Sequence, residues 1–179
     1  MSSPILITGA TGFIGRHLAR QLCANGDADR VRCLVRPSSD VGELERLGVK
    51  LVHGDVTDWD ALRAATEGCG QVVHLANLYS FWEPDPSVYR RINVEGTRLT
   101  AQAAIEAGVD LFLHVSTFAT FGRPTEVPFN EDSQPGPKRF SEYAQTKLEG
   151  DEIVEALAQE HQLPLAVVYP GSVLGAGDP

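Results

Sequence analysis

The chain has 179 residues, of which 42% are hydrophobic and 22% charged, and its formal net charge is −9 at pH 7. This composition is typical of a folded globular chain and excludes a disordered or fibrous one, so residues 1–179 are expected to form one domain. The negative charge argues against binding along a nucleic acid, and no apolar run reaches the ~20 residues that a membrane span needs.

No secretion signal is recognisable, because residues 1–15 contain no basic segment followed by an apolar stretch. The three cysteines, Cys23, Cys33 and Cys69, lie far apart and form no Cys-x-x-Cys pair. We therefore expect buried free thiols in a reducing cytoplasm. The five histidines are also scattered, so the sequence predicts no metal site.

Short apolar runs alternate with amphipathic stretches along the chain. In chain order the sequence predicts a strand over 5–8, a helix over 12–25, a strand over 31–35, a helix over 41–47, a strand over 50–53, a helix over 58–67, a strand over 71–76, a helix over 88–107, a strand over 111–117, a helix over 141–161 and a strand over 165–168. Asp58 is expected to cap the third helix, and Gly108 to end the fourth.

The alternation of apolar strands with helices indicates an α/β protein, with a parallel sheet covered by helices on both faces. Right-handed crossovers then give a Rossmann-type doubly wound sheet in the strand order 3-2-1-4-5-6. In such a sheet, ligands bind at the carboxyl ends of the strands.

A glycine-rich turn, TGATGFIG over residues 8–15, joins the first expected strand to the first expected helix. Glycine lets backbone N–H groups approach a pyrophosphate, which then lies at the positive end of the helix. The spacing is GxxGxxG rather than GxGxxG, so a closely packed turn without a ligand is the alternative. The position of the turn favours dinucleotide binding. The residues expected to contact the dinucleotide are Gly9, Thr11, Gly12, Phe13, Ile14 and Gly15.

Arg36 follows the second expected strand, where an acidic residue would bind the ribose 2′-OH of NAD. A guanidinium pairs with a 2′-phosphate, assisted here by the hydroxyls of Ser38 and Ser39. The sequence therefore favours NADP(H), with NAD as the alternative cofactor and a solvated arginine as the alternative without a ligand. Asp55, followed by Val56, could accept a hydrogen bond from the adenine amino group, although an aspartate in a turn needs no ligand.

Tyr143 and Lys147, in YAQTK, lie four residues apart on one face of the helix before the sixth strand. A nearby cation favours the phenolate and lowers the tyrosine pKa from roughly 10. Thr117 ends the fifth strand, and its hydroxyl and Tyr143 together could hold a carbonyl oxygen while hydride reaches the carbon. The alternatives are an exposed helix face for the pair and a strand-end hydroxyl without a role for Thr117.

Seven segments, in chain order, resemble the extended short-chain dehydrogenase/reductase superfamily, of the NAD-dependent epimerase/dehydratase type. They are TGATGFIG at 8–15, HGDVTD at 53–58, HLAN at 74–77, INVEGT at 92–97, VSTFATFG at 115–122, YAQTK at 143–147 and YPGSVLGAG at 169–177. Within the superfamily, segments 34–38, 77–86 and 93–97 resemble dihydroflavonol-4-reductase-like and hopanoid-associated epimerase-like proteins.

The resemblance implies roles for individual residues. Tyr143 would be the general acid/base, Lys147 would lower its pKa and bind the nicotinamide ribose, and Thr117 would orient the substrate, with Ser116 as the fallback. The residues that it implies around the cofactor are Ala76 and Asn77 beside the fourth strand, and Pro170, Gly171 and Val173 over the nicotinamide. Asn93 matches a structural asparagine. The chain departs from the family at Tyr169, where arginine is frequent, and at Thr120, where an aromatic is usual.

Family members usually continue well beyond position 179 into a small substrate-binding lobe. The chain is therefore expected to be a fragment without that lobe, weakly active or inactive alone. The helices over 88–107 and 141–161 could pair across a two-fold axis to form a homodimer, as in dimeric relatives. Phe81 and Trp82 could stack on a substrate or pack under a loop.

Three functions remain open from the sequence. The first is an NADP(H)-dependent oxidoreductase acting on a carbonyl or alcohol by a Thr/Tyr/Lys mechanism. The second is an NAD-dependent sugar-nucleotide epimerase or dehydratase with the same apparatus. The third is a nucleotide-binding regulatory protein whose chemistry is vestigial.

Overall fold

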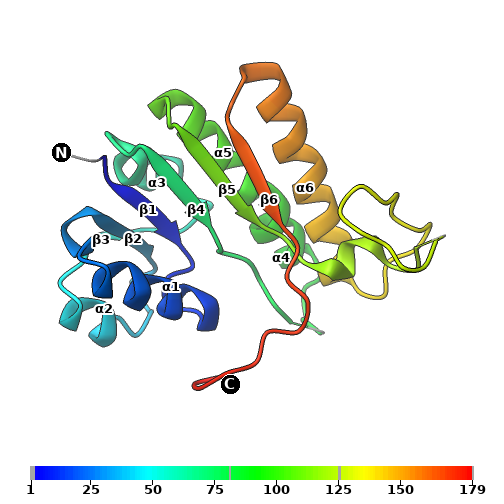
Figure 1. The fold of residues 1–179 in the computed structure, drawn as a ribbon, viewed down its shortest axis with the longest axis horizontal. Coiled ribbons are helices and arrows are strands. Elements are labelled where there is room, and N and C mark those ends of the chain that lie inside the picture. The colour runs from blue at the N-terminus through cyan, green and yellow to red at the C-terminus, as the bar shows by residue number, and fades with distance from the viewer. Residues whose placement is uncertain (1–2, 81, 125, 179) are drawn as a thin grey trace.

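A computed structural model of the chain describes residues 3–80, 82–124 and 126–178. Six strands form one parallel sheet in the order β3-β2-β1-β4-β5-β6, which confirms the predicted doubly wound topology (Figure 1). The strands are β1 (Ile5–Thr8), β2 (Val31–Val35), β3 (Lys50–His53), β4 (Gln71–His74), β5 (Leu111–Val115) and β6 (Leu165–Val168). The helices are α1 (Phe13–Ala24), α2 (Gly42–Arg46), α3 (Trp59–Thr66), α4 (Ser87–Tyr89), α5 (Gly96–Ala107) and α6 (Glu142–His161).

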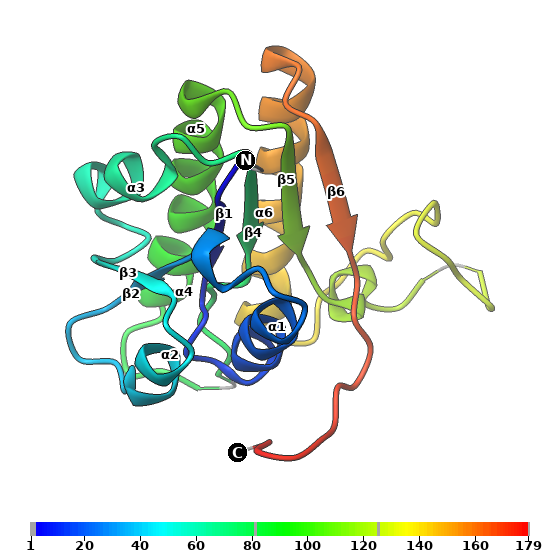
Figure 2. The same ribbon diagram turned by 60° about the vertical axis from the view of Figure 1, so that its left-hand side comes forward.

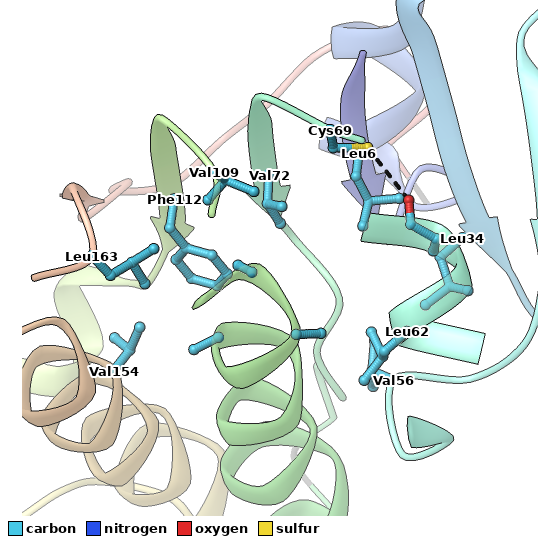
Figure 3. Packing of buried hydrophobic residues seen from close by; sticks show 14 residues of the cluster. Leu6, Leu34, Val56, Leu62, Cys69, Val72, Val109, Phe112, Val154 and Leu163 are labelled. Carbon is cyan, nitrogen blue, oxygen red and sulfur yellow. Dashed lines mark hydrogen bonds between the residues drawn. The ribbon is translucent and has the colours of Figure 1, made fainter. Parts of the chain in front are cut away.

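Helices cover both faces of the sheet, because side chains alternate along each strand. In β1, Leu6 packs with residues of α3, α5 and α6, whereas Ile5 and Ile7 pack with residues of α1 and α2. Figure 2 shows α1 in front of the sheet and α5 and α6 behind it. Figure 3 shows the hydrophobic cluster that contains Leu6, in which Phe112 points from β5 toward α5. In the same cluster the Sγ atom of Cys69 donates a hydrogen bond to the carbonyl oxygen of Ala65 at 3.4 Å.

Interior strands of the sheet are buried more completely than the edge strand β6. All residues of β1 and β2 are buried, whereas none of the four residues of β6 is. None of the helices in the described part of the chain is long and apolar enough to cross a membrane.

Local signals set several of the helix ends. The carboxylate of Asp58 accepts a hydrogen bond from the Ala61 amide at 3.1 Å, and the hydroxyl of Ser141 accepts one from the Ala144 amide at 3.1 Å. Gly108 adopts the left-handed conformation, with φ of 64°, at the end of α5. The ends at Asp58 and Gly108 confirm the predicted ones.

Two predicted boundaries differ from the structure. The strands predicted over 71–76 and 111–117 end at His74 and Val115. Beside β4, the neighbouring chain turns away at Gly9, and after β5 the side chain of Thr117 caps a short 3-10 helix, Phe118–Phe121.

The helix predicted over 88–107 is interrupted. It consists of α4, a π-helical segment Arg90–Glu95 and α5. In the π-helical segment the buried side chain of Asn93 accepts a hydrogen bond from the Leu78 amide at 2.7 Å and donates one to Thr146 Oγ1 at 3.1 Å. Such single π-turns are frequent near functional sites.

Candidate functional site

A cleft of about 980 Å³ lies at the carboxyl ends of the strands. It brings together nearly all the residues that the sequence singled out, from seven separate segments of the chain. The predicted residues that line it are Gly9, Thr11, Gly12, Phe13, Ile14, Gly15, Arg36, Asp55, Val56, Ala76, Asn77, Thr117, Tyr143, Pro170, Gly171 and Val173. Lys147 is the one predicted site residue outside this lining among the described residues.

The glycine turn needs glycine at two positions for steric reasons. Gly9 has φ of +73°, and a Cβ there would lie 2.7 Å from the backbone nitrogen of Ala76. A Cβ on Gly15 would overlap the carbonyl oxygen of Gly9. The turn is therefore packed tightly against the end of β4, on the floor of the cleft.

The N-terminus of α1 opens into the same cleft. Its capping residue, Gly12, offers no side chain to the helix, and the first turn of α1 contains no acidic residue. The amides of this turn and the helix dipole therefore favour a bound anion. These residues fit the pyrophosphate of a dinucleotide.

Arg36 lies on the exposed rim of the cleft, directly after β2, with Ser39 nearby in the lining. Within the described residues its guanidinium forms no ion pair, so it is available to a phosphate. Asp55 Oδ1 accepts hydrogen bonds from the amide of Thr57 at 3.0 Å and from its hydroxyl at 2.8 Å. Asp55 thus forms a turn in addition to lining the cleft.

Tyr143 and Thr117 meet at the far end of the cleft from Arg36. Thr117 lies close enough to Tyr143 to influence its ionisation, and the ring of Tyr79 packs edge-on against the ring of Tyr143 at 5.1 Å. Burial raises the pKa of Tyr143 to about 12, and the nearby Thr117 side chain opposes that rise. The predicted lowering of this pKa by Lys147 is therefore wrong for the chain alone, because desolvation of the phenol dominates.

Lys147 lies beneath the cleft floor, with 1% of its surface exposed. Its Nζ atom donates a hydrogen bond to the carbonyl oxygen of Val115 at 2.9 Å. Burial lowers the pKa of Lys147 to about 8, while the negative charge of Asp151 acts in the opposite direction. The ammonium group is thus directed at the end of β5 and lies within the electrostatic influence of Asp151.

The sequence matches, over residues 5–179, the family described as the NAD dependent epimerase/dehydratase family. The chain belongs to this family. Its sequence is 35% identical to sterol demethylase protein B of Methylococcus capsulatus, over 97% of this chain and 52% of that protein. It is 33% identical to a putative dihydroflavonol 4-reductase of Synechocystis, over 99% of this chain and 51% of that protein.

A solved structure of the dTDP-glucose 4,6-dehydratase DesIV from Streptomyces venezuelae, with NAD bound, resembles the chain with a TM-score of 0.82 and 30% identity. The match covers 92% of this chain and 54% of DesIV. The chain therefore spans about half the length of the relatives that it matches. The family and the fold predicted from the sequence motifs are confirmed.

The sequence did not predict that Asp151 and His114 form part of a buried polar cluster. Asp151 is 3% exposed and accepts hydrogen bonds from Ser116 and His114. Ser116, the fallback for Thr117, thus directs its hydroxyl at Asp151. The signal in the sequence was the spacing, because Asp151 follows Lys147 by one helical turn and shares its buried face.

Two aromatic residues singled out in the sequence, Trp82 and Tyr169, differ in their exposure and contacts. Trp82 is 75% exposed and lies outside the cleft lining, so it does not pack under a loop, and Phe81 lies outside the described residues. Tyr169, which stands where the family often has arginine, packs its ring against Phe121 at 5.2 Å.

Proposed function

We propose that the chain binds a nicotinamide dinucleotide in the cleft and acts as the catalytic half of an NADP(H)-dependent oxidoreductase for a carbonyl or alcohol. One observation carries this proposal. Thr117 and Tyr143 line the same cleft as the glycine turn between β1 and α1. A hydride carrier bound along the turn therefore lies in the compartment that contains a proton donor.

The glycine turn would hold the pyrophosphate through its backbone amides, and Arg36 would hold the 2′-phosphate of NADP(H). Ala76, Asn77 and the segment 170–173 would enclose the rest of the dinucleotide. When bound, the dinucleotide supplies or accepts the hydride.

In the direction of reduction, Thr117 and Tyr143 would hold the carbonyl oxygen of the substrate by hydrogen bonds. The pKa of Tyr143, about 12, keeps the phenol protonated at neutral pH, so it can donate a proton to that oxygen as the C–O bond becomes an alcohol. Lys147 would favour the phenolate that remains, provided that its ammonium stays charged.

The test is a fluorescence titration of the full chain with NADPH and with NADH, followed by a panel of aldehydes and ketones. We expect tighter binding of NADPH and reduction of at least one carbonyl compound. The proposal would be wrong if neither dinucleotide bound to a folded chain.

The second candidate is an NAD-dependent sugar-nucleotide epimerase or dehydratase, which the likeness to NAD-bound DesIV favours. Such an enzyme oxidises and then reduces its substrate without net consumption of the cofactor. NAD retained through purification and released by denaturation would support it, whereas exchangeable NADPH would support the reductase.

A homodimer through residues 88–107 and 141–161 is part of the proposal for the whole protein. In the chain, α5 and α6 pack side by side on the same face of the sheet, as Figures 1 and 2 show. We expect light scattering at micromolar concentration to give the mass of two chains, and a monomer would contradict this part.

A further inference from the structure

A buried carboxylate lies directly behind the Tyr143 and Thr117 pair. The Ser116 hydroxyl donates a hydrogen bond to Asp151 Oδ2 at 2.5 Å, and His114 Nε2 lies 2.9 Å from Asp151 Oδ1. Burial holds the pKa of His114 well below its usual range, so the neutral ring donates its Nε2–H to the carboxylate. Ser116 and His114, at the end of β5, thus both form hydrogen bonds with Asp151 of α6.

The position of Asp151 on α6 relates it to the proposed catalytic residues. Tyr143, Lys147 and Asp151 follow one another at intervals of four residues, so they lie on one face of the helix. On the strand side, Ser116 is the neighbour of Thr117, and the carbonyl of Val115 accepts the Lys147 hydrogen bond. The contacts between Asp151 and the end of β5 therefore fix the position of α6, along its own axis, relative to Thr117.

The polar contacts continue toward the glycine turn. The His114 ring stacks on His74 with ring centres 5.6 Å apart, and His74 Nδ1 lies 2.8 Å from the Thr8 hydroxyl. His74 Nε2 lies 3.1 Å from Thr97 Oγ1 of α5. A row of buried polar side chains thus runs beneath the cleft from the residue before Gly9 to Asp151.

A carboxylate in such a place is costly unless donors and a countercharge satisfy it. The donors are Ser116 and His114, and the countercharge is the ammonium of Lys147, whose pKa Asp151 raises against the effect of burial. The other ionisable groups that interact with Asp151 are Tyr143 and Glu155 on α6 and Tyr169 after β6.

We propose that Asp151 is a positioning residue of the site: it fixes α6 against the end of β5 and keeps the Lys147 ammonium charged behind Tyr143. This inference rests on the proposed function for the roles of Tyr143 and Lys147. It adds to that function a residue that touches neither the cleft nor a substrate and acts through Lys147 and Ser116.

The test follows the titration of Lys147 directly by NMR of the full chain with ¹³Cε-labelled lysine. The chain has three lysines, Lys50, Lys138 and Lys147. Their three NMR signals can be assigned by substituting each lysine in turn. Asp151→Asn keeps the shape of the side chain and removes its charge. Glu152→Gln makes the same chemical change on the adjacent, exposed residue and is the matched control.

We expect Asp151→Asn to lower the Lys147 titration midpoint by about one pH unit or more, and Glu152→Gln to leave it within about 0.3 unit. Equal midpoints in the two variants would overturn the proposal. In a carbonyl assay that the unsubstituted chain supports, Asp151→Asn should lower kcat about 2-fold at pH 7 and up to about 10-fold above pH 8, while the NADPH Kd changes less.

A second variant keeps the inference testable if Asp151→Asn does not fold. Ser116→Ala removes one donor and retains the charge, so the pKa of the Asp151 carboxyl, about 6 in the unsubstituted chain, should rise. An unchanged ¹³Cγ midpoint of Asp151 would contradict the role given to this contact. A chain that binds neither NADPH nor NADH but shows the Lys147 shift would refute the proposed function and leave the Asp151–Lys147 coupling standing.

Discussion

The strands on the two sides of β1 contribute to the cleft by different means. On the side of β2 and β3, the cleft is formed by a glycine turn, a helix terminus, exposed Arg36 and Asp55, so it offers backbone amides and two charged side chains near solvent. On the side of β4 to β6, Tyr143 lines the cleft and the buried ionisable side chains of Lys147 and Asp151 lie beneath it, where their opposite charges interact and their hydrogen bonds go to residues at the end of β5. Binding on the side of β2 and β3 depends on the shape of the backbone, and we call it the shape side. Chemistry on the side of β4 to β6 depends on which groups carry protons, and we call it the protonation side.

The largest effect is expected on the protonation side. Tyr143→Phe keeps the ring that packs on Tyr79 and removes the proton donor, so turnover should fall by roughly 10²–10⁴-fold. The NADPH Kd should stay close to that of the unsubstituted chain, because the glycine turn is untouched. Steady-state rates and a fluorescence titration on the same preparation measure both. If NADPH binding were lost together with turnover, the two sides of the cleft would not act separately, and the comparison would be wrong.

On the shape side, Gly9→Ala should destabilise the fold by about 2–4 kcal/mol, through backbone strain and the clash with Ala76. Dinucleotide binding should be lost with it. Gly26→Ala is the control, because Gly26 also has a positive φ of 90° but has nothing within 4 Å of an added Cβ. Urea unfolding of the two variants separates the clash from the strain, and equal losses would mean that the close approach at Gly9 is unimportant.

Arg36→Glu should weaken NADPH binding by about 1.5–3 kcal/mol and NADH binding much less, because only NADPH carries the 2′-phosphate. Arg46→Glu changes the same charge at the end of α2, outside the cleft, and should weaken neither. Isothermal titration of both dinucleotides gives the comparison. Equal losses for NADPH and NADH would leave Arg36 without the role proposed for it.

The most gradual predicted effect is a pH dependence of stability, because it is spread over the range between two pKa values. The folded state lowers the pKa of Lys147 from 10.5 to about 8, so between these values the unfolded chain binds more protons at this residue. The contribution of Lys147 to the free energy of unfolding should therefore rise with pH from about 8 to 10.5, by about 3 kcal/mol. Lys147→Met should lack this rise in urea unfolding series. The opposite slope would show that Lys147 is charged more easily in the folded chain.

The two sides also differ in how far the sequence revealed them. The glycine turn, Arg36 and the Thr117/Tyr143 pair were predicted because each depends on a local pattern or on its position at a strand end. The pKa of Tyr143 was predicted in the wrong direction, since a spacing of four residues from Lys147 indicates proximity but says nothing of desolvation. Asp151 was missed because its partners, His114 and Ser116, lie on another element.

By itself, the sequence determined the order of the strands, the fold class, the glycine turn and several helix ends, because hydrophobic period, turn residues and caps act over a few neighbouring positions. Only the tertiary structure decided which buried groups share protons and charge. It directs Lys147 at the end of β5 rather than into the cleft lining, and it interrupts the helix at Asn93. The physical reason is that desolvation and Coulomb energy sum over all neighbours in space, whereas a sequence pattern records neighbours along the chain.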